Sequence, residues 1–162
     1  MGNVTVSRTL GHAVGRVWSV LEDFGGIHRW SAGVESSPID PATPERGVGA
    51  VRNCHLYDGN HIEERVTESI EDEALGIDIV STSMPLRSAN ARFALEATSD
   101  GGTEVTMTMD YVVKFGVVGK AMNALMLERM MTKSLTNLLA ALDEHLKTGN
   151  LIEKGWQPAR AA

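Results

Sequence analysis

The chain has 162 residues, a formal net charge of −6 and a single cysteine. Its length suits one domain with a substantial core, and interspersed acidic charge without a basic stripe argues against a nucleic-acid partner. No apolar run reaches the length of a membrane span and no signal segment opens the sequence, so we expect a cytoplasmic protein. The lone Cys54 can form neither an internal disulfide nor a paired-cysteine metal site.

The first quarter of the chain predicts two strands that flank two short helical segments. Residues 3–11 contain the β-branched side chains typical of a strand. Apolar spacing over residues 12–24 predicts a helix that ends at a glycine pair, and residues 27–30 follow as a second short helix or turn. Residues 34–39 predict a short strand, after which a proline-containing loop begins.

The next segment predicts a hairpin, with strands over 48–56 and 61–70 and a turn at 58–60. Residues of like parity in a strand share one face. The even face of both strands is mostly apolar, yet it also carries Arg52 and Glu64. A charge on such a surface normally has a partner or a ligand. The pair therefore predicts either the polar wall of a cavity or a self-satisfied ion pair.

The register of this hairpin depends on its turn. A three-residue turn closed by residues 57 and 61 places Cys54 opposite Glu64, with Arg52 diagonally across from it. A two-residue turn would instead place Asn53 opposite Glu64 and divide the apolar face. The hydrophobic pattern favours the first register.

The second half of the chain predicts three more strands and one long helix. Residues 75–84 alternate weakly, a strand with an apolar odd face runs to about residue 97, and residues 103–115 alternate most clearly. The period then changes to that of a helix over residues 118–146. We expect one domain over residues 1–148 and a loose C-terminal tail over residues 149–162.

Successive hairpins predict an α+β fold in which a curved, seven-stranded antiparallel sheet wraps around the long C-terminal helix. One helix cannot fill the concave face of such a sheet. We therefore expect a cavity between the sheet and the helix, with an entrance formed by loops near Asp58 and after Met84 together with Val117-Val118.

Several sequence pieces resemble one known superfamily. Gly49-Ala50-Val51-Arg52, followed by Asp58-Gly59 and Glu64-Arg65, is similar to a hairpin of its receptor-like branch. The run from Asp23 to Ile27 with Trp30 resembles a segment of its bacterial members, and Leu86-Arg87 with Asn90 resembles a loop at the cavity mouth. Over residues 3–147 the chain thus resembles the START-like, or helix-grip, superfamily (SRPBCC), which includes birch-pollen-allergen-type proteins, polyketide cyclases/dehydratases, lipid-transport proteins and abscisic-acid receptors.

The chain also departs from the receptors of this superfamily. It lacks their Gly-Leu-Pro-Ala gate, carries Ala91 where they have a tyrosine, and carries Met109 where they place an inward acidic residue. The resemblance therefore implies the fold and an internal pocket, and it does not imply hormone perception.

The resemblance and the parity of the strands together give a set of candidate ligand-binding residues. They are Trp30, Arg52, Cys54, Glu64, Ile79, Ala91, Phe93, Met109, Tyr111, Met131 and Leu135. Trp30 is either a cavity neighbour or a core residue, and the Tyr111 hydroxyl binds either a ligand or the backbone. Histidine spacing and the lone cysteine predict no metal site, and no phosphate-binding motif predicts a nucleotide cofactor.

These features predict a protein that binds a small hydrophobic, aromatic or polyketide-like metabolite. The alternative is a cofactor-independent cyclase, aromatase or dehydratase that uses the same pocket, with Glu64 moving protons and Arg52 and Tyr111 assisting. A third hypothesis, an interaction module, lacks support without the gate sequence. Whether the protein forms a homodimer is left open.

Overall fold

The computed structural model describes residues 1–114 and 124–160. Seven strands and two helical segments precede a long helix. In chain order they are β1 (Gly2–Leu10), α1 (Val14–Glu22), the 3-10 helix η1 (Phe24–Arg29), β2 (Val34–Ser36), β3 (Val51–Leu56), β4 (His61–Ile70), β5 (Ala74–Thr82), β6 (Leu86–Ala97), β7 (Thr103–Val113) and α2 (Ala124–Thr148).

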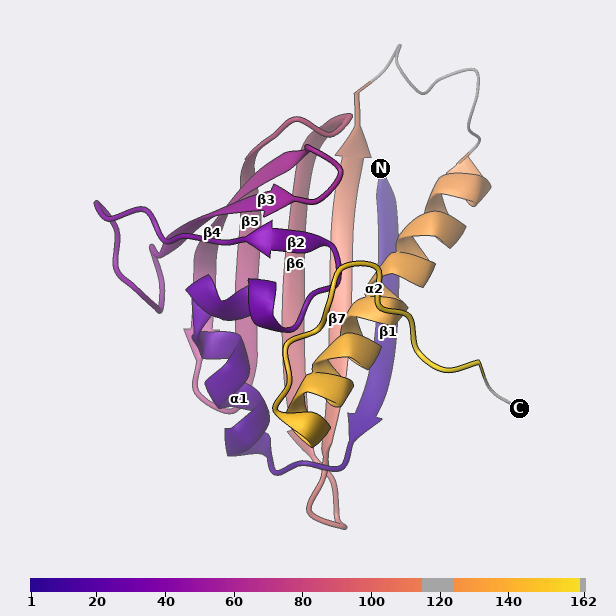
Figure 1. Cartoon of the computed structure of the whole chain (residues 1–162). Coiled ribbons are helices and arrows are strands. Elements are labelled where there is room, and N and C mark those ends of the chain that lie inside the picture. The colour runs from indigo at the N-terminus through magenta and orange to yellow at the C-terminus, as the bar shows by residue number, and fades with distance from the viewer. Residues whose placement is uncertain (115–123, 161–162) are drawn as a thin grey trace.

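All seven strands form one antiparallel sheet in the order β1-β7-β6-β5-β4-β3-β2. Each hairpin joins neighbouring strands, and β1 closes against the last strand by pairing Gly2 with Tyr111 and Leu10 with Thr103. Helix α2 lies across one face of this curved sheet, while α1 and η1 cover its lower part (Figure 1). The α+β helix-grip architecture expected from the sequence is confirmed.

The hydrophobic core fills the part of the molecule where α1, η1 and the second half of α2 meet the sheet. Leu10, Val17, Phe24, Leu139 and Leu142 are fully buried there. Of the long helix expected over residues 118–146, the part from Ala124 is described, and the stretch before it, with Val117-Val118, lies outside the described residues. No described helix is long and apolar enough to cross a membrane.

The β3–β4 hairpin has a different register from the expected one. Arg52 lies directly opposite Glu64, and Cys54 lies opposite Ile62. The loop consists of residues 57–59, because the Leu56 amide donates a 2.8 Å hydrogen bond to the Asn60 carbonyl. Its third residue, Gly59, has φ = 89°, a left-handed conformation that glycine adopts without steric cost.

The segment after α2, where a loose tail is expected over residues 149–162, begins with contacts to the rest of the domain. Ile152 is buried, and its amide donates a hydrogen bond to the Arg29 carbonyl. The Gly155 amide donates another to the Ala32 carbonyl. The chain after α2 therefore returns between η1 and α2, and it then crosses α2 and runs outward to the C-terminus (Figure 1).

Candidate functional site

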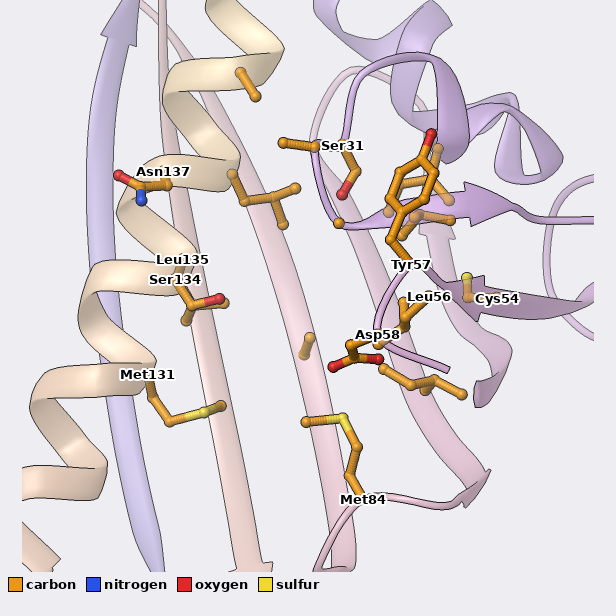
Figure 2. Close-up of a pocket in the computed structure, with 18 of the residues that line it drawn as sticks. Ser31, Cys54, Leu56, Tyr57, Asp58, Met84, Met131, Ser134, Leu135 and Asn137 are labelled. Carbon is orange, nitrogen blue, oxygen red and sulfur yellow. The ribbon is translucent and has the colours of Figure 1, made fainter. Parts of the chain in front are cut away.

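A cavity of about 770 Å³ lies between the concave face of the sheet and α2. Its volume falls within the range of small-molecule sites, which are commonly about 300–1,000 Å³. Figure 2 shows side chains of α2 on one side of the space, facing the loops and strands from η1 to β4 on the other. The expected cavity between sheet and helix is therefore present.

Two periodicities place apolar side chains on the cavity wall. Ala91 of β6 and the two β7 residues Met107 and Met109 point the same way because a strand alternates with period two. On α2, Met131 and Leu135 are four residues apart and so share one face of the helix. Methionine adapts to irregular spaces, so this wall suits ligands of varied shape.

Polar groups gather at the rim of the cavity. Tyr57 and Asp58 come from the β3–β4 loop, and Asn137 comes from α2 (Figure 2). A hydrogen bond from the Asn60 backbone amide holds the pKa of the Asp58 carboxyl below its usual value, so this group is charged at neutral pH. The loops around Asp58 and Met84, expected at the entrance, both supply lining residues.

The C-terminal segment forms a further part of this rim. Lys154, Gly155, Trp156 and Gln157 line the cavity. The Lys154 ammonium lies 5.3 Å from the centre of the Tyr57 ring, at the distance of a cation–π contact. The Asn137 amide donates to the Gln157 side-chain oxygen at 3.3 Å. The segment thus bridges α2 and the β3–β4 loop, a placement that its irregular sequence did not signal.

Glu64 is the acidic group of the inner wall, and Arg52 anchors it from behind. The Arg52 Nε donates to Glu64 Oε2 at 2.6 Å, and Nη1 donates to the Phe24 carbonyl at 2.9 Å. The guanidinium also lies 4.0 Å from the centre of the Phe24 ring. Glu64 lines the cavity whereas Arg52, with 5 % of its side chain exposed, does not.

Cys54 lies on the cavity wall, next to the ion pair of Arg52 and Glu64. Its thiol donates a hydrogen bond to Glu64 Oε2 at 3.4 Å. Burial is the main cause that raises the thiol pKa to about 12, and the nearby Glu64 carboxylate adds to it while Arg52 opposes it. The thiol therefore stays protonated at neutral pH, unlike a nucleophilic cysteine, which needs a lowered pKa.

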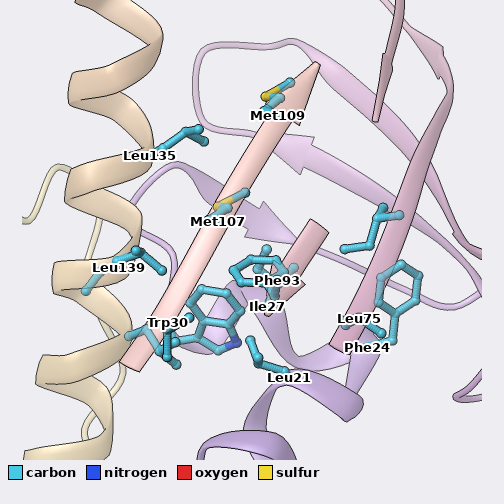
Figure 3. Packing of buried hydrophobic residues seen from close by; sticks show 14 of the residues in the cluster. Leu21, Phe24, Ile27, Trp30, Leu75, Phe93, Met107, Met109, Leu135 and Leu139 are labelled. Carbon is cyan, nitrogen blue, oxygen red and sulfur yellow. The ribbon is translucent and has the colours of Figure 1, made fainter. Parts of the chain in front are cut away.

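The cavity wall includes seven of the eleven candidate residues. They are Cys54, Glu64, Ile79, Ala91, Met109, Met131 and Leu135. Arg52, Trp30, Phe93 and Tyr111 lie outside the wall. Figure 3 shows Trp30 and Phe93 in the packed layer with Leu21 and Leu139, below Met109 and Leu135.

Tyr111 is buried at the end of β7 that pairs with the start of β1. A side chain on Gly2 would collide with the Tyr111 ring, so this glycine allows the phenol to pack against β1. Burial, and secondarily the charge of Glu128, raises the pKa of the phenol. The ligand-binding and catalytic roles expected for Arg52 and Tyr111 stay predictions, and any such role would act from outside the wall.

Two residues of α2 that line the cavity were not among the candidates, although the helical period indicates them. Leu138 and Ser134 fall on the same helical face as Met131 and Leu135, so the period of α2 could have identified them. Within residues 1–114 and 124–160, no group of three or more histidine, cysteine, aspartate or glutamate side chains could hold a metal ion.

Comparison with solved structures identifies several with the same fold. A START superfamily protein from Mycobacterium smegmatis has a TM-score of 0.76 at 14% identity, over 91% of this chain and 99% of that one. A protein from Thermobifida fusca has a TM-score of 0.73 at 22% identity, over 98% and 100% of the two chains. The protein XoxI from Bacillus cereus has a TM-score of 0.73 at 18% identity, over 91% and 97%.

At these identities the structural likeness establishes the fold alone. No curated protein is similar enough to the chain to count as a match. The family model described as "Polyketide cyclase / dehydrase and lipid transport" matches residues 1–147, which include every strand and nearly all of α2. The chain therefore belongs to the polyketide cyclase/dehydrase and lipid transport family, and it shares the fold of the START superfamily protein from Mycobacterium smegmatis.

Proposed function

We propose that this protein binds a small hydrophobic, aromatic or polyketide-like molecule in the cavity between the sheet and α2. The observation that carries the proposal is the cavity itself, about 770 Å³ in volume and walled largely by apolar side chains. A well-formed apolar cavity with a few convergent polar groups is the usual form of a small-molecule site. The family description, which includes lipid transport, supports the same reading.

The polar groups are suited to orienting such a ligand. Glu64 presents a carboxylate deep on the wall, and its Oε2 is held by Arg52 and Cys54. A carboxylate fixed in this way can accept a hydrogen bond from a ligand hydroxyl. At the rim, Tyr57, Ser134 and Asn137 can both donate and accept hydrogen bonds. The expected ligand thus has an apolar body and a few hydroxyl or carbonyl groups.

A cyclase or dehydratase that uses the same cavity is the second candidate, and one observation favours it. Glu64 places an acid–base group among apolar residues of the wall, where a bound poly-carbonyl chain would meet it. Against it, Arg52 already engages one Glu64 oxygen, and Tyr111 lies off the wall. Binding without turnover therefore has the stronger support.

A cavity-blocking substitution tests the binding proposal. Ala91→Trp fills the wall of β6, whereas Ala94→Trp on the same strand faces the opposite side of the sheet and serves as the control. We expect Ala91→Trp to weaken the binding of decanol, measured by titration calorimetry, by about tenfold or more, and Ala94→Trp to leave it unchanged. Equal affinities of both variants and the unmodified protein would refute binding in this cavity.

Glu64→Gln separates the binding protein from the enzyme. Glutamine keeps the size of the side chain and one acceptor oxygen but cannot take up a proton at neutral pH. A binding protein keeps its affinity for decanol within a few-fold after this change. An enzyme would bind equally well and lose its turnover of a poly-carbonyl substrate, and that loss would establish the second candidate.

A further inference from the structure

The sheet splits between β5 and β6. These strands pair from Ala74 and Ala94 as far as Ile79 and Ala89, and the pairing ends there. Residues 80–82 stay with β4, while the start of β6 stays with β7. The two strands therefore diverge on the way to their connecting loop and leave an opening in the sheet.

A β-bulge lies on each side of this opening. On β5, Ser81 and Ile79 pair with consecutive residues of β4, so Val80 is the extra residue. On β6, Leu86 and Ser88 pair with consecutive residues of β7, so Arg87 is the extra residue. Bulges redirect side chains and occur often beside functional sites. Here they accompany the divergence of the two strands.

A second, smaller pocket of about 200 Å³ occupies the opening, and its lining is cationic and hydroxylic. Arg87 and Lys114 supply two positive charges, and Ser81 and Ser88 supply hydroxyl groups. The Thr82 hydroxyl also lines the pocket, but it already donates a hydrogen bond to the His61 carbonyl. Among the described residues, no acidic side chain lines this pocket. A site with two cations, serine hydroxyls and no described carboxylate suits an anion.

Both cations are available to a ligand. Every ion pair within the described ranges 1–114 and 124–160 uses a basic residue other than Arg87 and Lys114. The Lys114 backbone is held in place, because its amide donates to the Pro85 carbonyl at 3.0 Å.

The small pocket adjoins the large cavity. Ile79 and Leu86 line both of them, so these two side chains form a shared wall. An elongated molecule that passes these two side chains would place a polar end between β5 and β6 and an apolar end under α2. This arrangement matches the division of an amphiphile into a head group and a tail.

We propose that the ligand is an acidic amphiphile whose ionised carboxylate binds Arg87 and Lys114 between β5 and β6. Its apolar body continues past Ile79 and Leu86 into the cavity. The proposal rests on the proposed function, because it assumes that the cavity takes an apolar ligand. Arginine suits a carboxylate because its planar donors can engage both oxygens, and the Lys114 ammonium adds a second charge.

The experiment compares decanoate with decanol by titration calorimetry at low salt and slightly alkaline pH. The two probes share a chain length and differ in the charge of the head group. We expect decanoate to bind roughly three- to tenfold more tightly, since exposed charge pairs contribute modestly. Added salt should reduce this preference.

Two double variants of equal net charge locate the carboxylate. Arg87→Gln/Lys114→Gln should abolish the preference for decanoate and leave the affinity for decanol unchanged. Arg129→Gln/Lys133→Gln removes two exposed charges of α2 that line neither pocket, and it should keep the preference.

Equal binding of the two probes by the unmodified protein would overturn the assignment of the head group while leaving the binding function intact. Loss of the preference in the Arg129/Lys133 variant, whether or not the Arg87/Lys114 variant also loses it, would overturn the assignment as well. If neither decanoate nor decanol bound the unmodified protein, the proposed function itself would fail.

Discussion

Replacing Arg52 by methionine tests whether this residue supports the fold rather than contacting a ligand. The substitution keeps a long apolar side chain and removes the guanidinium. Glu64 then loses a 2.6 Å hydrogen bond and its opposite charge, and the Phe24 carbonyl loses its donor. Both partners are largely buried, with 5% of the Arg52 side chain and 16% of the Glu64 side chain exposed.

The expected loss of stability is large because one charge is left without its partner. Removing one member of a buried ion pair commonly costs about 3–5 kcal/mol. For a chain of this size, about 2–4 °C of Tm accompanies each kcal/mol, so we expect Tm to fall by roughly 6–20 °C. Urea titration followed by circular dichroism gives the free energy of unfolding, and calorimetry gives Tm.

The chain supplies a matched control in a second cross-strand pair of arginine and glutamate. Arg92 and Glu68 are joined by two hydrogen bonds, but 50% and 34% of their side chains are exposed. Arg92→Met should therefore cost much less than Arg52→Met, because water screens and replaces the exposed pair. Adding Glu64→Gln to Arg52→Met should recover part of the loss, with a coupling of about 1–3 kcal/mol.

Either of two results would contradict a supporting role for Arg52. The first is an Arg52→Met variant that is no less stable than Arg92→Met. The second is a stably folded Arg52→Met variant whose affinity for decanol falls tenfold or more, which would place the guanidinium against the ligand.

Three further predictions concern Cys54, Tyr111 and the C-terminal segment. The native Cys54 thiol has a pKa near 12, above its ordinary 9.0, so the free energy of unfolding should fall as pH rises from 9 toward 12. Cys54→Ala should flatten this pH dependence in alkaline urea titrations, and an unchanged slope would contradict the prediction. Tyr111→Phe should leave decanol affinity unchanged, because Tyr111 lies off the wall, so a several-fold loss in calorimetry would restore its predicted role. Ile152→Ala should destabilise the protein by about 2–5 kcal/mol, as for other buried large-to-small changes; an unchanged urea midpoint would show a loose tail.

The fold could be predicted from the sequence because the hydrophobic residues recur clearly with the period of a strand in one segment and with that of a helix in another. Residues 103–113 alternate with period two, and the apolar residues of α2 recur with period 3.6. Parity also predicted which face of each strand meets the helix. Parity does not indicate how far along that face the cavity extends. Phe93 and Tyr111 share the inward face and were therefore expected on the cavity wall, but they lie outside it.

The hairpin register shows a second limit of pattern reasoning. The expected pairing of Cys54 with Glu64 and the observed pairing of Arg52 with Glu64 both match even positions with even positions. They bury the same face, so hydrophobicity cannot distinguish them. Turn chemistry could have done so, because Gly59 fits the left-handed third position of a three-residue loop.

The C-terminal segment illustrates a third limit. Residues 149–160 have no hydrophobic period, and isolated backbone hydrogen bonds and the buried Ile152 hold the part from Gly149 to Trp156 in place. The β5–β6 opening was equally hidden, because it depends on two bulges that no sequence pattern marks. Both features arise from tertiary contacts rather than from local propensity.

Methyl NMR of methionine tests ligand binding between the sheet and α2, because four methionines of the described residues line the cavity. They are Met84, Met107, Met109 and Met131. With the methyl groups labelled by carbon-13 and decanol added to saturation, these four resonances should shift and show contacts with the ligand chain. The methyl groups of Met1 and Met130, which are exposed, should stay unchanged. Shifts confined to the exposed methionines, with the four cavity resonances unmoved, would contradict ligand binding between the sheet and α2.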